Sequence, residues 1–326
     1  MAEGLIVLST FQFSPDSQRM LREAAQMDVV CVLRDEDFNA NLGRAEILCA
    51  YQVPDGWRDL APNLRWLQYP GAGLDSLRPS GLLDAGSGVI VTTAAGIHAT
   101  TISEYIFGSM LMFNWNWPEM VRLQASRVWA HSASWYNLGG RELEGQTLGI
   151  VGLGHIGRRV AQLGRAFGMQ VFGMRYSAKV GEQDNDVDRL FAAEQLHEML
   201  PLCDYLVLAV PLTSRTEGMI GEPELRLMKS NAYLLNVARG RVVDEQVLIR
   251  ALQEKWIAGA GLDVAEPEPL PPDSPLYTLQ NVILTPHISG VSVHYEQRLA
   301  ALFADNLRRY RAGQPLLNQY HAEREY

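Results

Sequence analysis

The sequence has few cysteines and no cysteine pattern, and this shortage narrows the classes of protein it can belong to. Its 326 residues include only Cys31, Cys49 and Cys203, which are far apart and form no CxxC pair. An odd number of scattered cysteines favours neither a disulfide framework nor a zinc site. We therefore assign no metal ligand and expect a reducing, cytoplasmic environment.

Basic residues and long hydrophobic runs are also scarce. Lysine and arginine total 28 against 37 aspartates and glutamates, which gives a formal net charge of −9. This charge disfavours non-specific attraction to nucleic acids and to anionic membranes. The most apolar stretch, residues 105–113, is much shorter than the roughly 20 residues that cross a bilayer. The N-terminus has no basic segment before its short apolar run, so we expect no signal peptide. From the charge and the short apolar stretch we expect no membrane partner and no nucleic-acid partner.

What the sequence does have is a repeated alternation of strand-like and helical patterns. Hydrophobic residues make up 47% of the chain, as in globular proteins, and a chain of this length usually forms two domains. The alternation predicts the α/β class with parallel sheets. We expect a doubly wound Rossmann cofactor domain at residues 98–287. A flavodoxin-like substrate domain is expected at residues 1–97 and 288–326, discontinuous because the last helical pattern returns to it.

A glycine-rich motif in the second alternation indicates a dinucleotide site. It lies between a predicted strand at 147–153 and a helical pattern, with another strand following, so the strand–helix–strand unit is complete. The three glycines suit a tight turn, a close approach of backbone to pyrophosphate, and close packing of helix on strand. A glycine-rich turn without a ligand is the much weaker alternative in this context. We assign cofactor contacts to Gly152, Gly154, His155, Ile156 and Gly157.

The second strand of this unit ends at an arginine, where folds that prefer NAD usually carry an acidic residue for the ribose 2′-hydroxyl. Arg175, Ser177 and Lys179 stand where a 2′-phosphate would lie. A guanidinium pairs well with phosphate, so we expect NADPH (NADP) as the preferred cofactor and leave NAD open. The alternative is that Arg175 is a surface residue and another acid binds the hydroxyl.

Three segments that follow predicted strands carry ionisable residues: Arg239 in NVARGR, Glu268 in GLDVAEPEP and His287 in LTPHISG. A histidine carries a proton near neutral pH, and a carboxylate beside it stabilises the imidazolium, so Glu268 and His287 suit an acid–base pair. An arginine binds a carboxylate through two hydrogen bonds and polarises a carbonyl. Such a set handles 2-keto or 2-hydroxy acids. The structural alternatives are a capping Arg239, a solvated Glu268 and a buried His287.

Over nearly the whole chain these motifs resemble the D-isomer-specific 2-hydroxyacid dehydrogenase family. Arg175 makes the chain more similar to glyoxylate/hydroxypyruvate reductases, many of which use NADPH. The resemblance implies an enzyme that reduces a small 2-keto acid to the D-2-hydroxy acid by hydride transfer. It implies that Arg239 binds and polarises the substrate, that Glu268 partners the histidine, and that His287 is the general acid/base.

The resemblance also implies further contacts with substrate and cofactor. The segment YPGAGLDSL is similar to a family loop whose backbone amides receive the substrate carboxylate, which points to Ala72 and Gly73. Asp263 is implied to meet the nicotinamide carboxamide. The remaining implied cofactor contacts are Thr101, Val210, Pro211, Thr216, Val237 and Ala238.

Alternatives remain open both for how the chain assembles and for what it does. The resemblance implies a homodimer in which Trp135 or Tyr136 borders the neighbouring active site, although simple interface packing is the better explanation of these residues. A nucleotide-sensing interaction protein of the C-terminal-binding corepressor type is an alternative function on the same fold. The complete set of Arg239, Glu268 and His287 argues against it. A formate-type or phosphite-type dehydrogenase of the same superfamily is a third interpretation.

Overall fold

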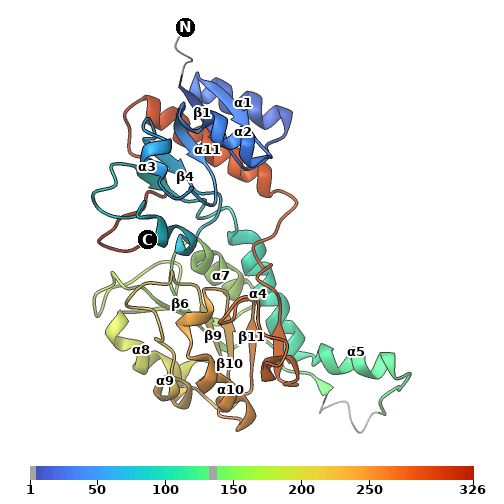
Figure 1. The fold of residues 1–326 in the computed structure, drawn as a ribbon. Coiled ribbons are helices and arrows are strands. Elements are labelled where there is room, and N and C mark those ends of the chain that lie inside the picture. Colours follow the sequence, from blue (N-terminus) through green and yellow to red (C-terminus); the bar gives the residue numbers. More distant parts are fainter. Residues whose placement is uncertain (1–4, 132–137) are drawn as a thin grey trace. The chain divides into compact units, whose positions relative to one another are not determined.

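The chain forms two compact α/β units, each built on a parallel sheet (Figure 1). The computed structural model describes residues 5–131 and 138–326. The first unit comprises Met1–Ile97 and Ser292–Tyr326, and the second comprises His98–Val291. Trp135 and Tyr136 lie outside the described residues. Among the residues described, no helix combines the length and the apolar character needed to span a membrane.

The sheet of the first unit has five parallel strands in the order β2-β1-β3-β4-β5. This order is the flavodoxin-like one, with the strand order reversing between β1 and β3. Strand β1 is buried throughout because all four of its residues lie between neighbouring strands and covering helices. The strands are β1 (Ile6–Ser9), β2 (Asp28–Cys31), β3 (Ala45–Cys49), β4 (Trp66–Gln68) and β5 (Ile90–Thr92).

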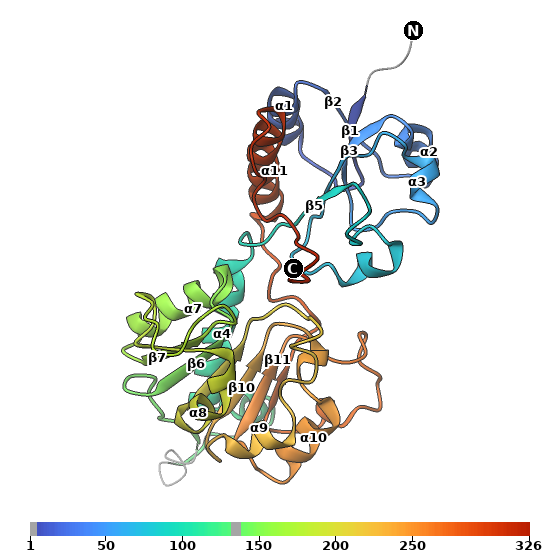
Figure 2. The same ribbon diagram turned by 90° about the vertical axis from the view of Figure 1, so that its left-hand side faces the viewer.

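One face of this sheet is covered by the first and last helices of the chain. Figure 2 shows α1 and α11 side by side, and Phe303 of α11 packs against the Trp66 ring at a centroid distance of 5.4 Å. The Ser14 side chain caps α1 by accepting a hydrogen bond from the Ser17 amide, as the SPDSQ pattern predicts. The burial of α11 here explains why the unit is discontinuous in sequence. The helices are α1 (Pro15–Ala25), α2 (Asp35–Leu42), α3 (Trp57–Leu60), η1 (Asp75–Ser80) and α11 (Tyr295–Arg311).

The sheet of the second unit has seven parallel strands in the order β12-β11-β10-β9-β6-β7-β8. The order reverses between β6 and β9, which is the arrangement of a doubly wound dinucleotide-binding sheet. The predicted α/β class with two parallel sheets is therefore confirmed. The strands are β6 (Thr147–Val151), β7 (Gln170–Met174), β8 (Arg189–Phe191), β9 (Tyr205–Leu208), β10 (Tyr233–Asn236), β11 (Gly259–Leu262) and β12 (Val282–Leu284).

Helices cover both faces of this sheet and enclose two apolar cores. One core joins β6 to α4 and α7 through residues such as Ile106 and Val160, and the other contains Leu225 of α9 and Leu248 of α10. In α7 the buried Gly157, Val160, Ala161 and Gly164 form one stripe at helical spacing. The helices are α4 (Ala99–Asn114), α7 (His155–Ala166), α8 (Leu196–Met199), α9 (Glu222–Leu227), α10 (Glu245–Gln253), η3 (Ala193–Gln195), η4 (Leu200–Leu202), η5 (Gly240–Val242) and η6 (Pro275–Tyr277).

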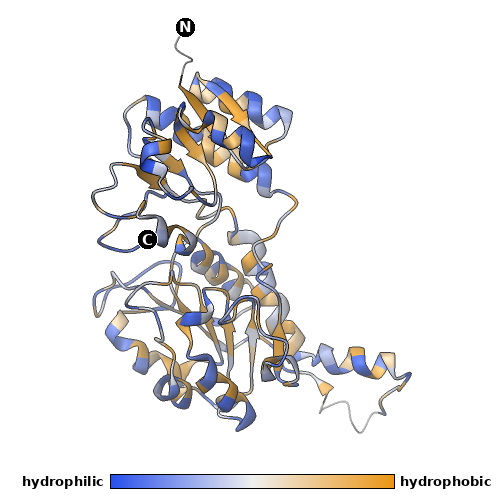
Figure 3. Cartoon of the chain, viewed as in Figure 1, coloured by the Kyte–Doolittle hydropathy of each residue, from blue (hydrophilic) through white to orange (hydrophobic). Residues whose placement is uncertain are grey.

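One helix of the second unit is uncovered. Helix α5 (Trp117–Ala125) has no buried residue and extends away from the sheet of its own unit (Figure 1). Hydrophobic residues nevertheless alternate with hydrophilic ones along it (Figure 3), and Trp129, just beyond it, is 89% exposed. The exposed apolar residues here are Trp115, Trp117, Val121, Val128 and Trp129, and we call this set the α5 patch.

Candidate active site

The glycine-rich turn after β6 is held by close contacts between backbone segments. Gly152 has a φ of 104°, and its amide donates a hydrogen bond of 2.9 Å to the Met174 carbonyl at the end of β7. A Cβ atom at Gly157 would lie 1.9 Å from the Gly152 carbonyl oxygen, so only glycine lets α7 begin this close to the turn. The carboxyl ends of β6 and β7, the glycine-rich turn and the first turn of α7 therefore pack directly against one another.

Gly154 differs from the other two glycines of the motif. Its φ is ordinary, it is exposed, and a Cβ atom added to it would meet nothing within 4 Å. Packing within the protein therefore does not require glycine at this position, and the space beside it is open. His155 and Ile156 follow in the first turn of α7, where helix amides and the positive end of the helix dipole favour a phosphate. This turn fits the pyrophosphate of a dinucleotide.

Two further loops leave the sheet beside this turn. Ala209 donates its amide to the Val151 carbonyl at 2.9 Å, which places Val210 and Pro211 after β9 and next to β6. The Thr216 hydroxyl donates to the Pro211 carbonyl at 2.6 Å and thereby closes the loop on itself. Val237 and Ala238 follow β10 and are buried, and Thr101 lies in the first turn of α4, where its hydroxyl donates to the His98 carbonyl at 3.1 Å.

His287 and Glu268 form a direct hydrogen bond. His287 Nδ1 lies 2.7 Å from Glu268 Oε2, and both side chains are accessible, with exposed fractions of 45% and 38%. The other carboxylate oxygen, Oε1, accepts a hydrogen bond from the Ala265 amide at 3.2 Å. The carboxylate is thus held by its own loop while it orients the imidazole ring, and the ring remains accessible to a ligand.

The backbone of His287 is held in an uncommon conformation. Its φ is 54°, in the left-handed region, which costs a non-glycine residue about 1–2 kcal/mol. The buried Asp263 holds this turn: its carbonyl accepts from the His287 amide at 2.8 Å, and its carboxylate accepts from the amides of Ile288 and Ser289 at 2.9 Å each. Asp263 therefore sets the direction in which the His287 ring leaves the chain.

The Asp263 carboxylate has one more partner, which extends the network to α4. The Thr285 hydroxyl lies 2.6 Å from Asp263 Oδ1 and 2.8 Å from the Tyr105 hydroxyl. Because a carboxylate only accepts, Thr285 donates to Asp263, and Tyr105 donates to Thr285. Burial raises the pKa of Tyr105, so this hydroxyl stays protonated. Sequence analysis did not find Thr285 or Tyr105, because no short motif links residues 180 positions apart.

Arg239 is placed by the loop that follows β10. The buried Asn236 accepts from the Ala238 amide and donates to the Arg239 carbonyl, both at 3.0 Å, and Arg239 Nη1 donates to the Ala238 carbonyl at 2.7 Å. A Cβ atom at Gly240 would lie 2.1 Å from the Ala265 carbonyl oxygen, so glycine lets this loop lie directly on the loop that carries Glu268.

The three ionisable residues thus belong to one edge of one sheet. Strands β10, β11 and β12 are parallel neighbours, in a register that aligns Asn236 with Leu262 and Leu262 with Leu284. Arg239, Glu268 and His287 follow these strands at their carboxyl ends, where ligands bind in doubly wound sheets. The structure brings the loops of all three together.

Ala72 and Gly73 belong to the first unit, in the loop after β4. Ala72 is exposed and Gly73 is half-buried. The start of the loop is fixed, because Tyr295 of α11 donates its hydroxyl to the Pro70 carbonyl at 2.8 Å. A Cβ atom at Gly71 would lie 2.7 Å from the Tyr69 ring, which explains the small residue there. Both residues thus lie at the surface of the first unit.

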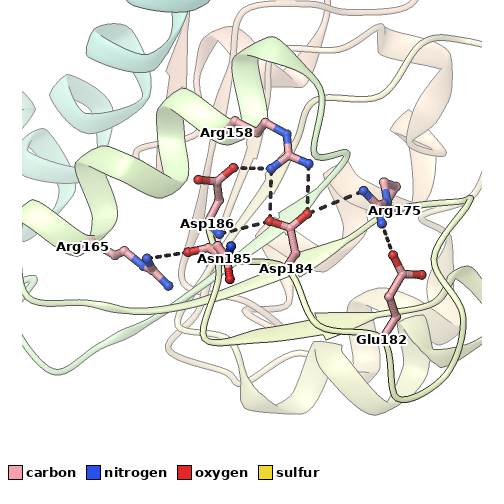
Figure 4. Close-up of polar contacts among 7 residues, drawn as sticks. All are labelled: Arg158, Arg165, Arg175, Glu182, Asp184, Asn185 and Asp186. Atoms are coloured by element: carbon pink, nitrogen blue, oxygen red, sulfur yellow. Dashed lines mark hydrogen bonds and ion pairs between the residues drawn. The ribbon is translucent and has the colours of Figure 1, made fainter.

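Arg175 lies in a network that the sequence did not reveal (Figure 4). Its guanidinium forms ion pairs with Glu182 and, at 3.5 Å, with Asp184. Arg158 of α7 contacts the same Asp184 through two hydrogen bonds of 2.9 and 3.1 Å and holds the pKa of that carboxyl below its usual value. Ser177 is exposed nearby in sequence. The acidic segment EQDND at 182–186 is the sequence feature that points to ion pairs here, but its spacing does not indicate which arginines it contacts.

Comparison with known proteins agrees with this geometry. Residues 107–289 match the domain described as D-isomer specific 2-hydroxyacid dehydrogenase, NAD binding domain. A glyoxylate reductase of Korarchaeum cryptofilum is 36% identical over 258 residues, 78% of this chain and 76% of that protein. One of Thermofilum pendens is 34% identical over 307 residues, 93% of this chain and 84% of that protein. A D-isomer specific 2-hydroxyacid dehydrogenase from Xanthobacter autotrophicus Py2, crystallised with NADPH and MES, is 29% identical over the full length of both chains, with a TM-score of 0.83.

The sheet order, the glycine-rich turn and these matches together define the class of protein. The chain belongs to the D-isomer specific 2-hydroxyacid dehydrogenase family of oxidoreductases, and its second unit is an NAD(P)-binding domain. The family expected from the sequence motifs is thereby confirmed.

The glycine-rich turn provides a matched pair of substitutions. Gly157→Ala forces a Cβ atom against the Gly152 carbonyl, so we expect the free energy of unfolding to fall by about 1–3 kcal/mol. Gly154→Ala has open space around it, so we expect wild-type stability but at least tenfold weaker NADP⁺ binding. Thermal unfolding and equilibrium binding measure the two effects. Normal cofactor binding by Gly154→Ala would contradict the assignment of this turn to pyrophosphate.

Proposed function

We propose that this chain reduces a small 2-keto acid, of the glyoxylate or hydroxypyruvate type, to the D-2-hydroxy acid, with NADPH preferred over NADH. The observation that carries the proposal is the 2.7 Å hydrogen bond between His287 and Glu268, on loops packed against that of Arg239 at the carboxyl edge of a dinucleotide-binding sheet. Relatives named glyoxylate reductase, at 34–36% identity, support the substrate class.

Each of the three residues has a separate task in this proposal. The bound nicotinamide supplies the hydride that adds to C2 of the keto acid. His287 then gives a proton from Nε2 to the carbonyl oxygen, because Nδ1 is engaged by Glu268. Glu268 fixes the ring and stabilises the imidazolium before that transfer. The planar guanidinium of Arg239 binds the substrate carboxylate and polarises the carbonyl. In the reverse direction the same histidine takes the hydroxyl proton.

The remaining contacts are proposed on the same grounds. The backbone amides of Ala72 and Gly73, in the first unit, are proposed to receive the substrate carboxylate because their loop is similar to the family loop with that role, which makes that unit the substrate domain and the second unit the cofactor domain. The turn at 152–157 binds the pyrophosphate, and Arg175 with Ser177 binds the 2′-phosphate. Thr101, at the start of α4, is proposed to contact the cofactor phosphates, and Asp263 the nicotinamide carboxamide. The residues proposed to line the cofactor groove are Val210, Pro211, Thr216, Val237 and Ala238.

We also propose a cytoplasmic homodimer. The free cysteines Cys31, Cys49 and Cys203 suit a reducing compartment. The α5 patch exposes Trp115, Trp117 and Trp129 together with two valines, and a group of exposed apolar side chains of this kind is typical of a surface that binds another protein. A second copy of the chain is the occupant we propose for this surface.

Removing the imidazole tests its catalytic role. We expect His287→Ala to lower kcat by about 10²–10⁴-fold with hydroxypyruvate, while the Kd for NADPH changes less than twofold. Arg239→Lys should also lower turnover, because the compact charge of an ammonium group does not reproduce the paired hydrogen bonds of a planar guanidinium. His197→Ala is a matched control, since His197 also pairs with a glutamate, Glu224, at 2.7 Å but lies on α8. Equal losses of turnover and cofactor binding in His287→Ala would mean that the histidine is structural.

Initial rates with glyoxylate, hydroxypyruvate, pyruvate and longer 2-keto acids test substrate and cofactor together. We expect the small keto acids to be reduced fastest, and NADPH to be preferred over NADH at equal concentration. Arg175→Ala should raise the KM for NADPH about tenfold or more and leave that for NADH unchanged, since it removes a charge-assisted hydrogen bond. Dinucleotide binding without turnover would instead favour the nucleotide-sensing function.

Sedimentation tests the proposed dimer. We expect a particle of twice the 36.3 kDa chain mass, and we expect Trp129→Glu to shift it toward the monomer because a charge would be buried at the interface. The control is Val293→Glu, a residue of the first unit that is 93% exposed. A wild-type particle with the mass of one chain would contradict the proposal.

A further inference from the structure

Two carboxylates of the chain itself engage Arg175, the residue expected to hold the 2′-phosphate (Figure 4). Arg175 directly follows Met174, whose carbonyl accepts from the Gly152 amide, so it stands beside the glycine-rich turn. Its Nε atom is buried without a hydrogen-bond partner, while its terminal nitrogens reach Glu182 and Asp184. The terminal nitrogens Nη1 and Nη2 are therefore the atoms of Arg175 that interact with anions.

The two carboxylates are held very differently. The Asp184 side chain is only 9% exposed, and it accepts two hydrogen bonds from Arg158 and one from the Asp186 amide at 3.0 Å. It is a fixed part of the fold. The Glu182 side chain is 37% exposed and, apart from Arg175, it accepts only the Lys179 amide at 2.9 Å among the contacts in this part of the chain. A glutamate held this way can swing into solvent.

Because Glu182 carries a negative charge, it competes with any phosphate group for Arg175. The cluster contains three carboxylates, of Glu182, Asp184 and Asp186, against the two guanidinium groups of Arg158 and Arg175. A phosphate monoester adds a charge of about −1.5 to −2 and needs the same guanidinium nitrogens. Like charges placed side by side are strongly unfavourable. A ribose diol, in contrast, donates hydrogen bonds, and a carboxylate accepts them.

We propose that Glu182 determines cofactor specificity by competing with the 2′-phosphate of NADP(H) for Arg175. Asp184 holds the guanidinium in position through its fixed pairing with Arg158, and Glu182 occupies the face that the phosphate needs. Binding of the phosphorylated dinucleotide displaces Glu182 into solvent, whereas the unphosphorylated dinucleotide leaves it in place. This inference rests on the proposed function, which assigns Arg175 to the 2′-phosphate.

The test is equilibrium binding of NADP⁺ and NAD⁺ to the full chain, by titration calorimetry, with the ratio of the Kd for NAD⁺ to the Kd for NADP⁺ as the readout. Glu182→Gln keeps the size of the side chain and removes its charge. We expect this ratio to rise about three- to tenfold, mainly through tighter NADP⁺ binding. Glu198→Gln is the matched control, because Glu198 is an exposed glutamate that pairs weakly with Arg189 at 3.9 Å.

Two results separate a failure of this inference from a failure of the proposed function. If Arg175→Ala weakens NADP⁺ binding but Glu182→Gln leaves the ratio unchanged or lowers it, the competition is refuted and the phosphate assignment stands. If Arg175→Ala leaves both Kd values unchanged, the phosphate assignment fails and the competition fails with it. Glu182 is partly exposed, so its variant should fold, and an unchanged melting temperature verifies this.

Discussion

The buried carboxylate of Asp263 is the interaction on which the geometry of the candidate site depends. It accepts hydrogen bonds from the amides of Ile288 and Ser289 and from the Thr285 hydroxyl, while its own carbonyl accepts from the His287 amide. These bonds hold His287 in the left-handed region, which an isolated chain would avoid. Only with the backbone held there does the ring leave the chain toward Glu268. Burying a carboxylate is costly, and here the three hydrogen bonds that the carboxylate accepts offset that cost.

Close contacts between backbones provide the second constraint, and they explain the glycines of the motifs. Gly157 allows α7 to start against the Gly152 carbonyl, and Gly240 allows the Arg239 loop to lie on Ala265. Both contacts occur at the carboxyl ends of parallel strands. The first follows β6, beside which the strand order reverses, and the second joins the loops that follow the neighbouring strands β10 and β11. The glycine-rich turn and the ionisable residues thus lie along the same edge of the same sheet, the edge at which doubly wound sheets bind their ligands.

Local patterns predicted the sheet of the second unit and the turn at 152–157, because each depends on residues close in sequence. The pairing of Glu268 with His287 was expected from chemistry, and the structure places them in contact. The network of Arg175, Glu182 and Asp184 was not predicted, because a loop of irregular backbone decides which carboxylate faces which arginine. The link from Tyr105 through Thr285 to Asp263 joins distant elements, and only the folded chain reveals it.

In the reaction that we propose, hydride passes from the cofactor to C2 of a 2-keto acid while His287 protonates the oxygen. The most direct test is reduction of hydroxypyruvate with NADPH deuterated at the transferable C4 position, followed by mass spectrometry and chiral analysis of the product. Our account predicts D-glycerate that carries one deuterium at C2. An unlabelled product, or the L-isomer, would contradict it.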